Sequence, residues 1–407
     1  MSMTTTDLPA TGSWSADPDP NDLPLPRVSA SALATEDPVR ERYRAEGTRR
    51  ALALDNRGPL RITADGRLEP AILDAYWRHG FYVFQAVVGR EERHDMARDV
   101  ADLLERAPLA PGGRLDRHGR PALGADCQGR NVSMVKPLSD PYGGSAVNHG
   151  RHPARMHTPE VPEGAPDYVM QLLLGPLQHS IAHLRLYGHP ALLTIAASVN
   201  GDDFVPFNES LWIKAPRLGG SVAWHQDGWT HWDSPTLDAG THGFNLMMQL
   251  YGCDAANGLW VVPGTHDQGR VDIAAMVAAA GSDMLPDAVP LICDPGDVVI
   301  CNRQVVHGSF ANTSDRIRVT MNCGFHRRAS VLGVRSGGVH NPVALYDEAY
   351  IAHRARIIGY AIDARRQRFA NEQPFDYRPL ADAGSSVRWD EAARADMHDY
   401  NLFDMGI

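Results

Sequence analysis

Between residues 206 and 325 the chain consists of short runs of β-favouring residues separated by turn residues, and this pattern most constrains the fold. Several short strands at close spacing are typical of antiparallel sandwiches and barrels. We therefore expect a mainly β fold with flanking helices, arranged as an antiparallel sandwich or a jelly roll. The expected strands are residues 211–215, 221–224, 244–251, 259–262, 298–301 and 316–325.

Helical patterns lie on both sides of this β region, and a short helix ending at Trp77 precedes one more strand at residues 80–84. The patterns combine apolar residues at helical spacing with charged residues. The charged face of the last one is typical of solvated surface. The expected helices are residues 37–55, 91–105, 167–187, 190–197 and 353–368.

Changes in residue composition and periodicity divide the chain into three parts. Pro, Asp, Ser and Thr dominate residues 1–35, which we expect to form a disordered arm. Residues 36–330 then form the main domain, and residues 331–407 a helical C-terminal extension. Within the main domain, residues 107–165 are rich in Gly, Pro, Arg and His without a sustained period, which predicts a long loop or insertion.

Charge and cysteine content limit the partners and the compartment. The formal net charge of −10 argues against a sequence-independent hold on nucleic-acid phosphates. The five cysteines include no Cys-x-x-Cys pair, which is typical of reduced thiols in a cytoplasmic protein. No run of about 18 apolar residues occurs, so we expect no membrane partner. The expected partners are a small-molecule substrate and further copies of the chain in a homo-oligomer.

A His-x-Asp pair at a strand end directs both side chains to the same face, because side-chain direction repeats every two residues. The chain holds two such pairs, His225-Gln-Asp227 and His231-Trp-Asp233. The first directly follows the strand predicted at residues 221–224. The second lies beyond Gly228 in a segment that leads to a Ser-Pro dipeptide. We therefore take His225 and Asp227 as the candidate metal ligands.

A third ligand is expected from a distant strand that folds beside the first. His307 follows two valines and precedes Gly308, a few residues after a turn and strand at residues 294–301. Taken alone, it is a typical core histidine. Together with His225 and Asp227 it completes the two-histidine, one-carboxylate set that holds non-haem iron(II) and leaves positions open for ligands.

An arginine on a neighbouring strand could bind an anionic co-substrate, because its planar fork matches a carboxylate. Residues 316–322 alternate, with polar Arg316, Arg318, Thr320 and Asn322 on one face and apolar side chains on the other. The polar face either turns into the barrel, where it needs a polar ligand, or forms a solvated outer surface. Because both arginines lie on the same face of the predicted strand, the alternation does not tell whether Arg316 or Arg318 would bind the co-substrate.

With these motifs in order, residues 68–325 resemble the phytanoyl-CoA dioxygenase family of Fe(II)- and 2-oxoglutarate-dependent oxygenases. The motifs are a Trp77-to-Phe84 helix and strand, His225-Gln-Asp227 preceded by Lys214-Ala-Pro, the stretch from Asn257-Gly258 to Pro263-Gly-Thr-His266, and His307-Gly-Ser309 followed by Arg318. The resemblance implies that residues 36–330 are the dioxygenase domain, built on a double-stranded β-helix core of the jelly-roll, cupin-like kind. It also implies Fe(II), 2-oxoglutarate and O₂ as cofactors and co-substrates.

The resemblance also implies roles for single residues. The family's co-substrate arginine lies eleven residues after the distal histidine, which here is Arg318, and a hydroxyl two residues after that histidine is Ser309. Met247 stands where the family often has an aromatic residue against the co-substrate. Gln226 either lines the pocket or completes a turn. Asn208 and Lys214 lie on or beside the strand that leads to His225, and point either to the site or away.

The retained carboxylate of Asp227 bears on the reaction, because the related halogenases have a small residue at this position. The resemblance therefore implies hydroxylation, or another oxidative change of a C–H bond, on a small molecule in a biosynthetic pathway. Two other readings use the same three ligands: a cupin-like metalloenzyme without 2-oxoglutarate, which has no need of Arg318, and a non-catalytic metal-binding protein, which tolerates loss of Asp227.

Overall fold

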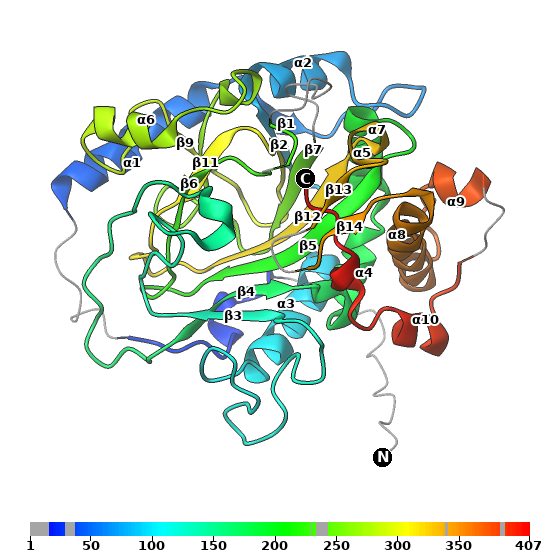
Figure 1. Ribbon diagram of the computed structural model, residues 1–407, viewed down its shortest axis with the longest axis horizontal. Helices are drawn as coiled ribbons and strands as arrows, with labels where there is room; N and C mark the ends of the chain where they lie inside the picture. Colours follow the sequence, from blue (N-terminus) through cyan, green and yellow to red (C-terminus); the bar gives the residue numbers. More distant parts are fainter. Residues whose placement is uncertain (1–15, 29–36, 229, 233–242, 338–340, 383–386) are drawn as a thin grey trace.

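The computed structural model describes residues 16–28, 37–228, 230–232, 243–337, 341–382 and 387–407. Eight strands form a large sheet through the middle of the molecule (Figure 1). The neighbours in this sheet are antiparallel except for β1 and β2. In sheet order, its strands are β1 (Arg57–Pro59), β2 (Phe81–Gln85), β10 (Val298–Asn302), β7 (Gly243–Gln249), β12 (Arg318–His326), β5 (Val205–Lys214), β4 (Val169–Leu174) and β3 (Val132–Val135).

A smaller antiparallel sheet faces the large one, and residues from both sheets line one cavity. Its strands are β6 (Val222–His225), β11 (Val306–Ser309), β8 (Trp260–Val262) and β9 (Val289–Pro290). A separate pair joins β13 (Arg335–Ser336) to β14 (Ala344–Leu345). The predicted mainly β fold with a double-stranded β-helix core is confirmed.

Strand β12 shows why the two faces of the large sheet differ. Val319 and Met321 point to the outer face and pack into the main hydrophobic core. Arg318, Thr320 and Asn322 point to the inner face and line the cavity. The polar face of this strand therefore turns into the barrel, which leaves its hydrogen-bonding groups available to a ligand.

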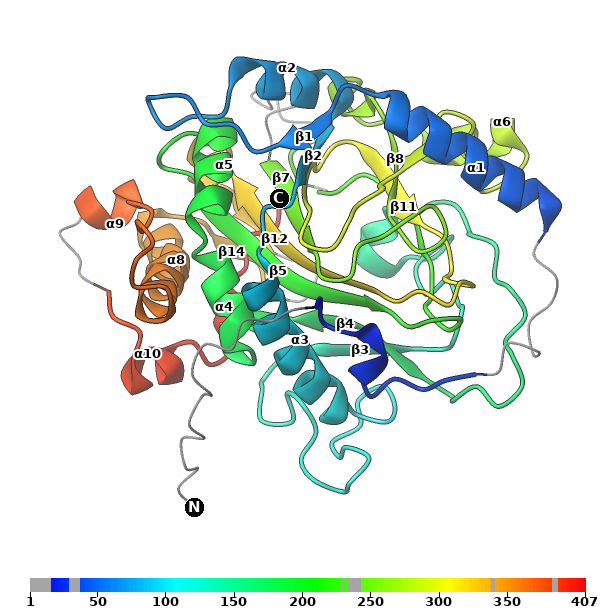
Figure 2. The ribbon, with the colours of Figure 1, turned by 180° about the vertical axis from the view of Figure 1, so that it is seen from behind.

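Helices cover the outer face of the large sheet (Figure 2). The covering helices are α3 (Arg90–Glu105), α4 (Ile181–Tyr187), α5 (Pro190–Asn200) and α8 (Glu348–Arg368). Helix α1 (Pro38–Ala53) packs against β9 of the small sheet, and α2 (Pro70–His79) against β2. The remaining helices are α6 (Ile273–Ala280), α7 (Arg328–Val331), α9 (Arg378–Asp382) and α10 (Glu391–Asp396).

The helix predicted over residues 167–187 is wrong in its first half, where the chain forms strand β4. All six residues of β4 are buried, because one face of the strand meets helices and the other meets the cavity or its rim. A short, uniformly apolar run carries no period that separates a buried strand from a buried helix. Only the second half, α4, is helical as expected.

The expectation that the charged face of the helix at residues 353–368 is solvated is also wrong for two arginines of α8. Arg354 is 1% exposed and contacts the carboxylates of Glu209 and Asp404, at 2.6 and 3.0 Å. Arg365 is also buried, and it bonds to Glu92 and Glu372. Buried charges need such partners, so these pairs fasten the C-terminal extension to the domain.

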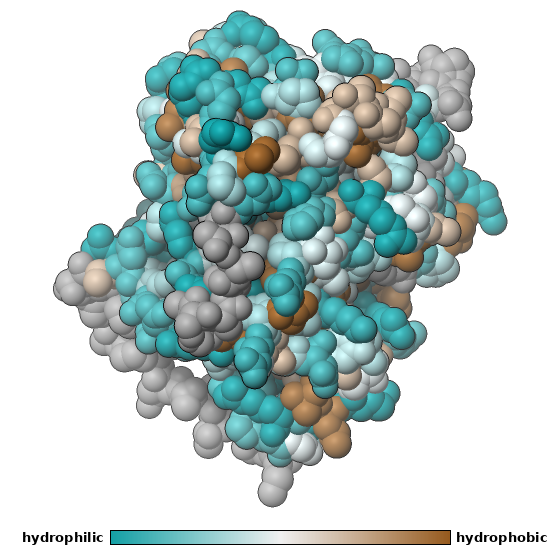
Figure 3. Space-filling view, turned by 90° about the vertical axis from the view of Figure 1, so that its left-hand side faces the viewer, coloured by the Kyte–Doolittle hydropathy of each residue, from teal (hydrophilic) through white to brown (hydrophobic). Residues whose placement is uncertain are grey.

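The two regions without a clear sequence pattern both contact the domain. In the described part of the arm, Leu23 packs into the main core and Asp17 pairs with Arg93. Residues 107–165 consist mostly of turns, together with β3, and reach the cavity. Within the described chain, no helix is both long and apolar enough to cross a membrane. The face in Figure 3 is mostly hydrophilic, with scattered apolar side chains.

Candidate metal and co-substrate site

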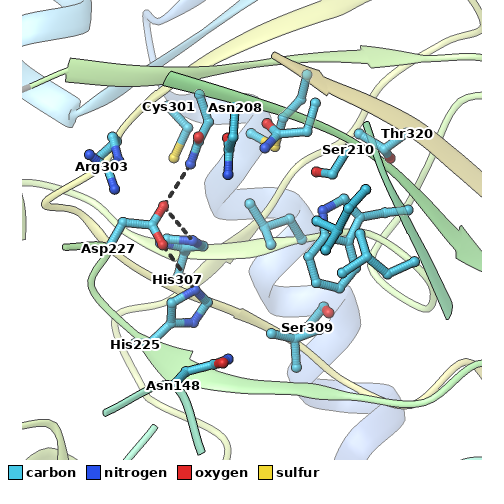
Figure 4. Close-up of a pocket in the computed structure, with 18 of the residues that line it drawn as sticks. Asn148, Asn208, Ser210, His225, Asp227, Cys301, Arg303, His307, Ser309 and Thr320 are labelled. Atoms are coloured by element: carbon cyan, nitrogen blue, oxygen red, sulfur yellow. Dashed lines mark hydrogen bonds and ion pairs between the residues drawn. The ribbon is translucent and has the colours of Figure 1, made fainter. Parts of the chain in front are cut away.

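The three candidate metal ligands come together on the small sheet (Figure 4). His225 ends β6 and lies directly opposite His307 of β11 in the antiparallel register. Asp227 follows two residues after His225, and its two carboxylate oxygens lie 3.6 Å from Nε2 of His225 and 3.9 Å from Nε2 of His307. The ligand atoms therefore surround one point at the wall of the cavity.

Hydrogen bonds to the main chain fix the tautomer of both imidazoles. Nδ1 of His225 lies 2.9 Å from the carbonyl oxygen of Ala223, and Nδ1 of His307 lies 2.9 Å from that of Val305. A carbonyl oxygen can only accept, so each Nδ1 carries the proton and each Nε2 keeps its lone pair. Both lone pairs are then free to bind a metal beside Asp227.

Burial and neighbouring charges set the protonation of this group. Burial, followed by the nearby His225, lowers the pKa of His307 to about 4, so the ring is neutral at neutral pH. Burial would raise the pKa of Asp227, but its contacts with His225 and His307 and the positive charge of Arg151 outweigh burial and hold the pKa well below its usual value. The group therefore presents one carboxylate and the Nε2 atoms of two imidazoles to a metal.

A second group of metal-type side chains lies at the surface, where Asp126 and Cys127 meet His398. The Asp126 side chain is 80% exposed, against 13% for Asp227. Exposed ligands compete with water and are held less firmly, so the buried group on the small sheet is the candidate metal centre. His231 of the other His-x-Asp pair is described, whereas Asp233 lies outside the described residues.

Several residues that the sequence did not single out surround Asp227. Asn245 of β7 donates its amide to one carboxylate oxygen at 2.8 Å. Arg151 lies 3.5 Å from the other oxygen, and the carbonyl of Arg303 accepts the backbone N–H of Asp227 at 2.8 Å. His152 packs against His225, with ring centroids 4.2 Å apart. For Arg151 and His152, the available signal was the Arg- and His-rich composition of residues 107–165.

The predicted co-substrate residues lie on the same cavity. Arg318 is 5% exposed and donates one hydrogen bond to the carbonyl of Asn257 at 3.2 Å. Its Nε and the hydroxyl of Ser309 are buried and have no hydrogen-bond partner among the described residues. Arg316, by contrast, is exposed and pairs with Asp254 at 2.8 Å. Arg318 and Ser309 thus offer unused donors where a carboxylate could bind.

The other four predicted binding residues divide into two pairs. Met247 and Asn208 line the cavity. Gln226 lies outside its lining and bonds to the backbone of Gly269, Val271 and Gln304, which holds neighbouring loops together. Lys214 is buried, also outside the lining, and donates to the carbonyl of Phe310. Roles of all four in cofactor binding stay predictions.

The donor set fits iron(II). Two imidazoles and one carboxylate on one side of a metal leave three positions for co-substrate and O₂, which is the arrangement of non-haem iron(II) oxygenases. The unpartnered Arg318 Nε and Ser309 hydroxyl fit a dicarboxylate whose other end reaches the metal. One cavity thus holds a donor set that fits iron(II) and buried donors that fit a dicarboxylate.

A family model described as phytanoyl-CoA dioxygenase matches residues 76–320, more than half of the chain. The chain belongs to the phytanoyl-CoA dioxygenase family. The resemblance seen in the motifs is thereby confirmed, and with it membership among the Fe(II)- and 2-oxoglutarate-dependent dioxygenases. The matched range contains His225, Asp227, His307, Ser309 and Arg318.

Two curated proteins similar to this family member are a dioxygenase, lolE1, of Epichloe uncinata and phytanoyl-CoA dioxygenase 1 of Oryza sativa subsp. japonica. The first is 30% identical over 140 residues, which are 33% of this chain and 51% of the relative. The second is 31% identical over 116 residues, 26% of this chain and 39% of the relative. The chain therefore spans about half or less of the length of these relatives.

Among solved structures, this chain is similar to EctD from S. alaskensis with 2-oxoglutarate and 5-hydroxyectoine. The TM-score is 0.45 at 17% identity, over 67% of this chain and 81% of EctD. A second similar structure is SnoN, a non-haem α-ketoglutarate-dependent epimerase from nogalamycin biosynthesis. Its TM-score is 0.41 at 16% identity, over 63% of this chain and 84% of SnoN.

Proposed function

We propose that this protein is an Fe(II)- and 2-oxoglutarate-dependent dioxygenase that hydroxylates a C–H bond of a small molecule, as part of a biosynthetic pathway. One observation carries the proposal. The His225, Asp227 and His307 group lies on the same cavity as two buried donors, Arg318 and Ser309, that lack partners among the described residues. A metal-binding protein that does not use a dicarboxylate has no need of these donors.

The residues divide the work between metal and co-substrate. His225 and His307 would bind Fe(II) through Nε2, and Asp227 would supply the charge that favours the divalent ion. Arg318 would bind the far carboxylate of 2-oxoglutarate with its fork, assisted by Ser309. When bound, iron and 2-oxoglutarate supply the oxidation of a C–H bond by O₂, with succinate and CO₂ as co-products.

The remaining walls would position the substrate and limit water. Trp212, Leu172 and Leu259 give the cavity an apolar section. Exclusion of water strengthens the electrostatic contacts of the bound ligands and suppresses side reactions. The carboxylate of Asp227 fills one metal position, so we propose hydroxylation in preference to halide transfer.

Anaerobic addition of Fe(II) and 2-oxoglutarate tests this function. The wild-type protein should give a weak visible charge-transfer band, and admission of O₂ should remove the band and yield succinate. His307→Ala should give neither signal. A wild-type protein without the band would contradict the proposed use of 2-oxoglutarate and would favour a cupin-like enzyme of another type.

A further inference from the structure

Arg303 lies in the turn between β10 and β11 and lines the cavity beside Asp227 (Figure 4). Arg303 is buried, with 3% of its surface exposed. Its backbone carbonyl accepts the N–H of Asp227 at 2.8 Å, so the residue is tied directly to the candidate metal centre. The guanidinium is thus a buried positive charge at a defined place next to the reacting region.

The described partners of the Arg303 side chain are all neutral. One nitrogen, Nη1, donates to Nε2 of His326 at 3.1 Å. The guanidinium also lies over the ring of Phe207, 4.2 Å from its centroid. Nε is buried and has no hydrogen-bond partner in the described part of the chain. Because arginine only donates, Nε2 of His326 must be unprotonated here, and it brings no countercharge.

Phe207 reaches this place because the neighbouring strand has a glycine. At Gly324 of β12, a Cβ atom would lie only 1.7 Å from the Phe207 ring. The strand pairing is irregular between Cys323 and Phe325 at the same point. The ring therefore passes close to the strand at Gly324 and lies under the guanidinium, and Arg303 lines the cavity.

Comparison among the buried arginines shows that Arg303 is unusual. Five described arginines are buried, and three of them form ion pairs: Arg93 with Asp17, Arg354 with Glu209 and Asp404, and Arg365 with Glu92 and Glu372. The other two, Arg303 and Arg318, form no ion pair within 4.0 Å among the described residues, and both line the cavity. Burial of an unpaired charge is costly.

Two anionic groups, one at each arginine, would neutralise the two unpaired charges. On the proposed function, Arg318 receives the far carboxylate of 2-oxoglutarate. Asp227 acts on Arg303 electrostatically, but its oxygens face the two histidines and Asn245. Coordination of Fe(II) by Asp227 would further reduce the negative charge that this carboxylate offers to Arg303. Arg303 therefore lacks an anion of its own in the loaded site.

The net charge of the loaded site supports the same conclusion. Fe(II), Arg318, Arg303 and Arg151 are positive, and they outweigh Asp227 and the two carboxylates of 2-oxoglutarate by two charges. Asp404 also lines the cavity and shares Arg354 with Glu209, so these three residues together add at most one negative charge. A positive excess remains inside a cavity with little water to screen it.

The same cavity also has neutral polar groups in its wall. Asn148, Asn341 and Asn401 line it together with Asn208 and Asn322, and the last two have buried amide oxygens without a partner among the described residues. Amide oxygens accept hydrogen bonds from hydroxyl or N–H groups. An occupant that satisfies both regions carries one anionic group and several neutral donors.

We propose that Arg303 binds an anionic group of the substrate, a carboxylate or a phosphate-type oxyanion, beside the metal. This inference rests on the proposed function and narrows the substrate class to polar acids. An anion at Arg303 could instead be the metal-bound carboxylate of 2-oxoglutarate itself. The chemistry is shared, and the experiment separates the two sources.

The test uses the full chain loaded with Mn(II) and 2-oxoglutarate, which keeps oxidative turnover out of the measurement. Acetate and inorganic phosphate are titrated at constant ionic strength, with acetamide as the neutral control, and the melting temperature is followed. A ligand that binds the folded state alone raises this temperature. The wild type should respond to acetate or phosphate and not to acetamide.

Substitution of Arg303 should remove this response. In Arg303→Met, the anion concentration at half effect should rise about tenfold or more, the loss expected for hydrogen bonds to a charged group. Arg303→Lys keeps the positive charge but lacks the planar guanidinium, so the anion concentration at half effect should rise several-fold less than in Arg303→Met. Arg217→Met, which removes an arginine paired with Asp315 away from the cavity lining, should respond as the wild type does.

The affinity for 2-oxoglutarate, measured in the same variants by its charge-transfer band with Fe(II), separates the sources. A substrate-anion site predicts little change in Arg303→Met. Weakening comparable to that of Arg318→Gln would assign Arg303 to the co-substrate and overturn the proposal. An unchanged anion response in Arg303→Lys and Arg303→Met would overturn it as well. Absence of the band in the wild type would instead contradict the proposed function.

Discussion

The two sheets that face the cavity hold their functional side chains in different ways. On the small sheet, His225 and His307 are fixed by carbonyl groups of their own strands and by direct register between the strands. On the large sheet, Arg318 and Asn322 project from the strand surface with hydrogen-bonding atoms that have no described partner. On the small sheet the metal ligands are already oriented and the Ser309 hydroxyl is left for a ligand, whereas on the large sheet polar atoms of several side chains are left for one.

This difference between the two sheets indicates which wall binds the metal and which wall binds the organic ligands. A wall whose donors are already oriented suits a metal, because metal ligands must meet at one point before the ion binds. A wall with unused donors and acceptors suits organic ligands, since buried polar groups without partners are costly. We therefore assign the metal to the small sheet and the co-substrate and substrate mainly to the large one, with Ser309 of the small sheet as a further co-substrate donor.

The strongest test of this assignment is Asp227→Ala on the small sheet. Removal of the carboxylate leaves a divalent ion with two imidazole ligands and no anionic one, so we expect loss of bound iron and of detectable succinate formation. Metal content after dialysis and succinate yield measure the effect. Asp315→Ala, at a side chain that is 72% exposed, is the control and should behave as the wild type. Retention of iron and turnover in Asp227→Ala would break the comparison.

Arg354→Met tests the outer side of the large sheet. The substitution leaves Glu209 buried without its arginine, which should lower the free energy of unfolding by about 3–5 kcal/mol. Urea unfolding measures this loss. Arg356→Met on the same helix removes a more exposed pair with Asp396 and should cost less than about 1 kcal/mol. Iron affinity of the folded Arg354→Met protein should not change, because Arg354 lies outside the cavity lining.

Arg318→Gln tests the inner side of the same sheet. Loss of a buried, charge-paired donor should raise the KM for 2-oxoglutarate about 100-fold. Arg316→Gln lies two residues away on the same polar side, but its arginine is exposed and pairs with Asp254, so its KM should stay near the wild-type value. Equal effects in the two variants would leave the large sheet without a specific carboxylate site.

Asn245→Ala is the smallest expected effect and sharpens the boundary between the sheets. Asn245 belongs to the large sheet, yet its amide donates to Asp227. Loss of such a bond to a metal ligand should weaken Fe(II) binding about tenfold, as read by metal titration. Asn322→Ala lies on the same cavity wall without a described contact to Asp227 and should leave the metal affinity intact. A loss in both variants would mean that the large sheet shapes the metal centre generally.

The parts of this site that follow a local pattern could be predicted from the sequence. The β-type runs predicted the jelly roll, and the strand before His225 separated it from His231. Alternation in residues 316–322 predicted one polar face, and the structure turns that face inward. The choice between Arg316 and Arg318 came from the family resemblance. The structure agrees with it in one respect: Arg318 faces the cavity, whereas Arg316 is exposed.

The parts that depend on long-range closure could not be predicted. Arg151 and His152 reach the site from an aperiodic segment, and Arg303 lies in a turn, so no period marks any of them. Strand β4 was mistaken for helix because its burial on both faces comes from tertiary packing. The buried pairs of Arg354 were missed for the same reason: Glu209 is 145 residues away in the sequence.

The main-chain acceptors behind the two imidazoles have an evolutionary consequence. Ala223 and Val305 hold the rings through their carbonyl oxygens, and every residue type has such an oxygen. Substitution at either position therefore leaves the acceptor in place, as long as the strand keeps its course. Changes in the cavity walls can accumulate around two imidazoles whose hydrogen-bond acceptors are main-chain atoms. A lineage could then exchange one substrate for another without first losing its chemistry.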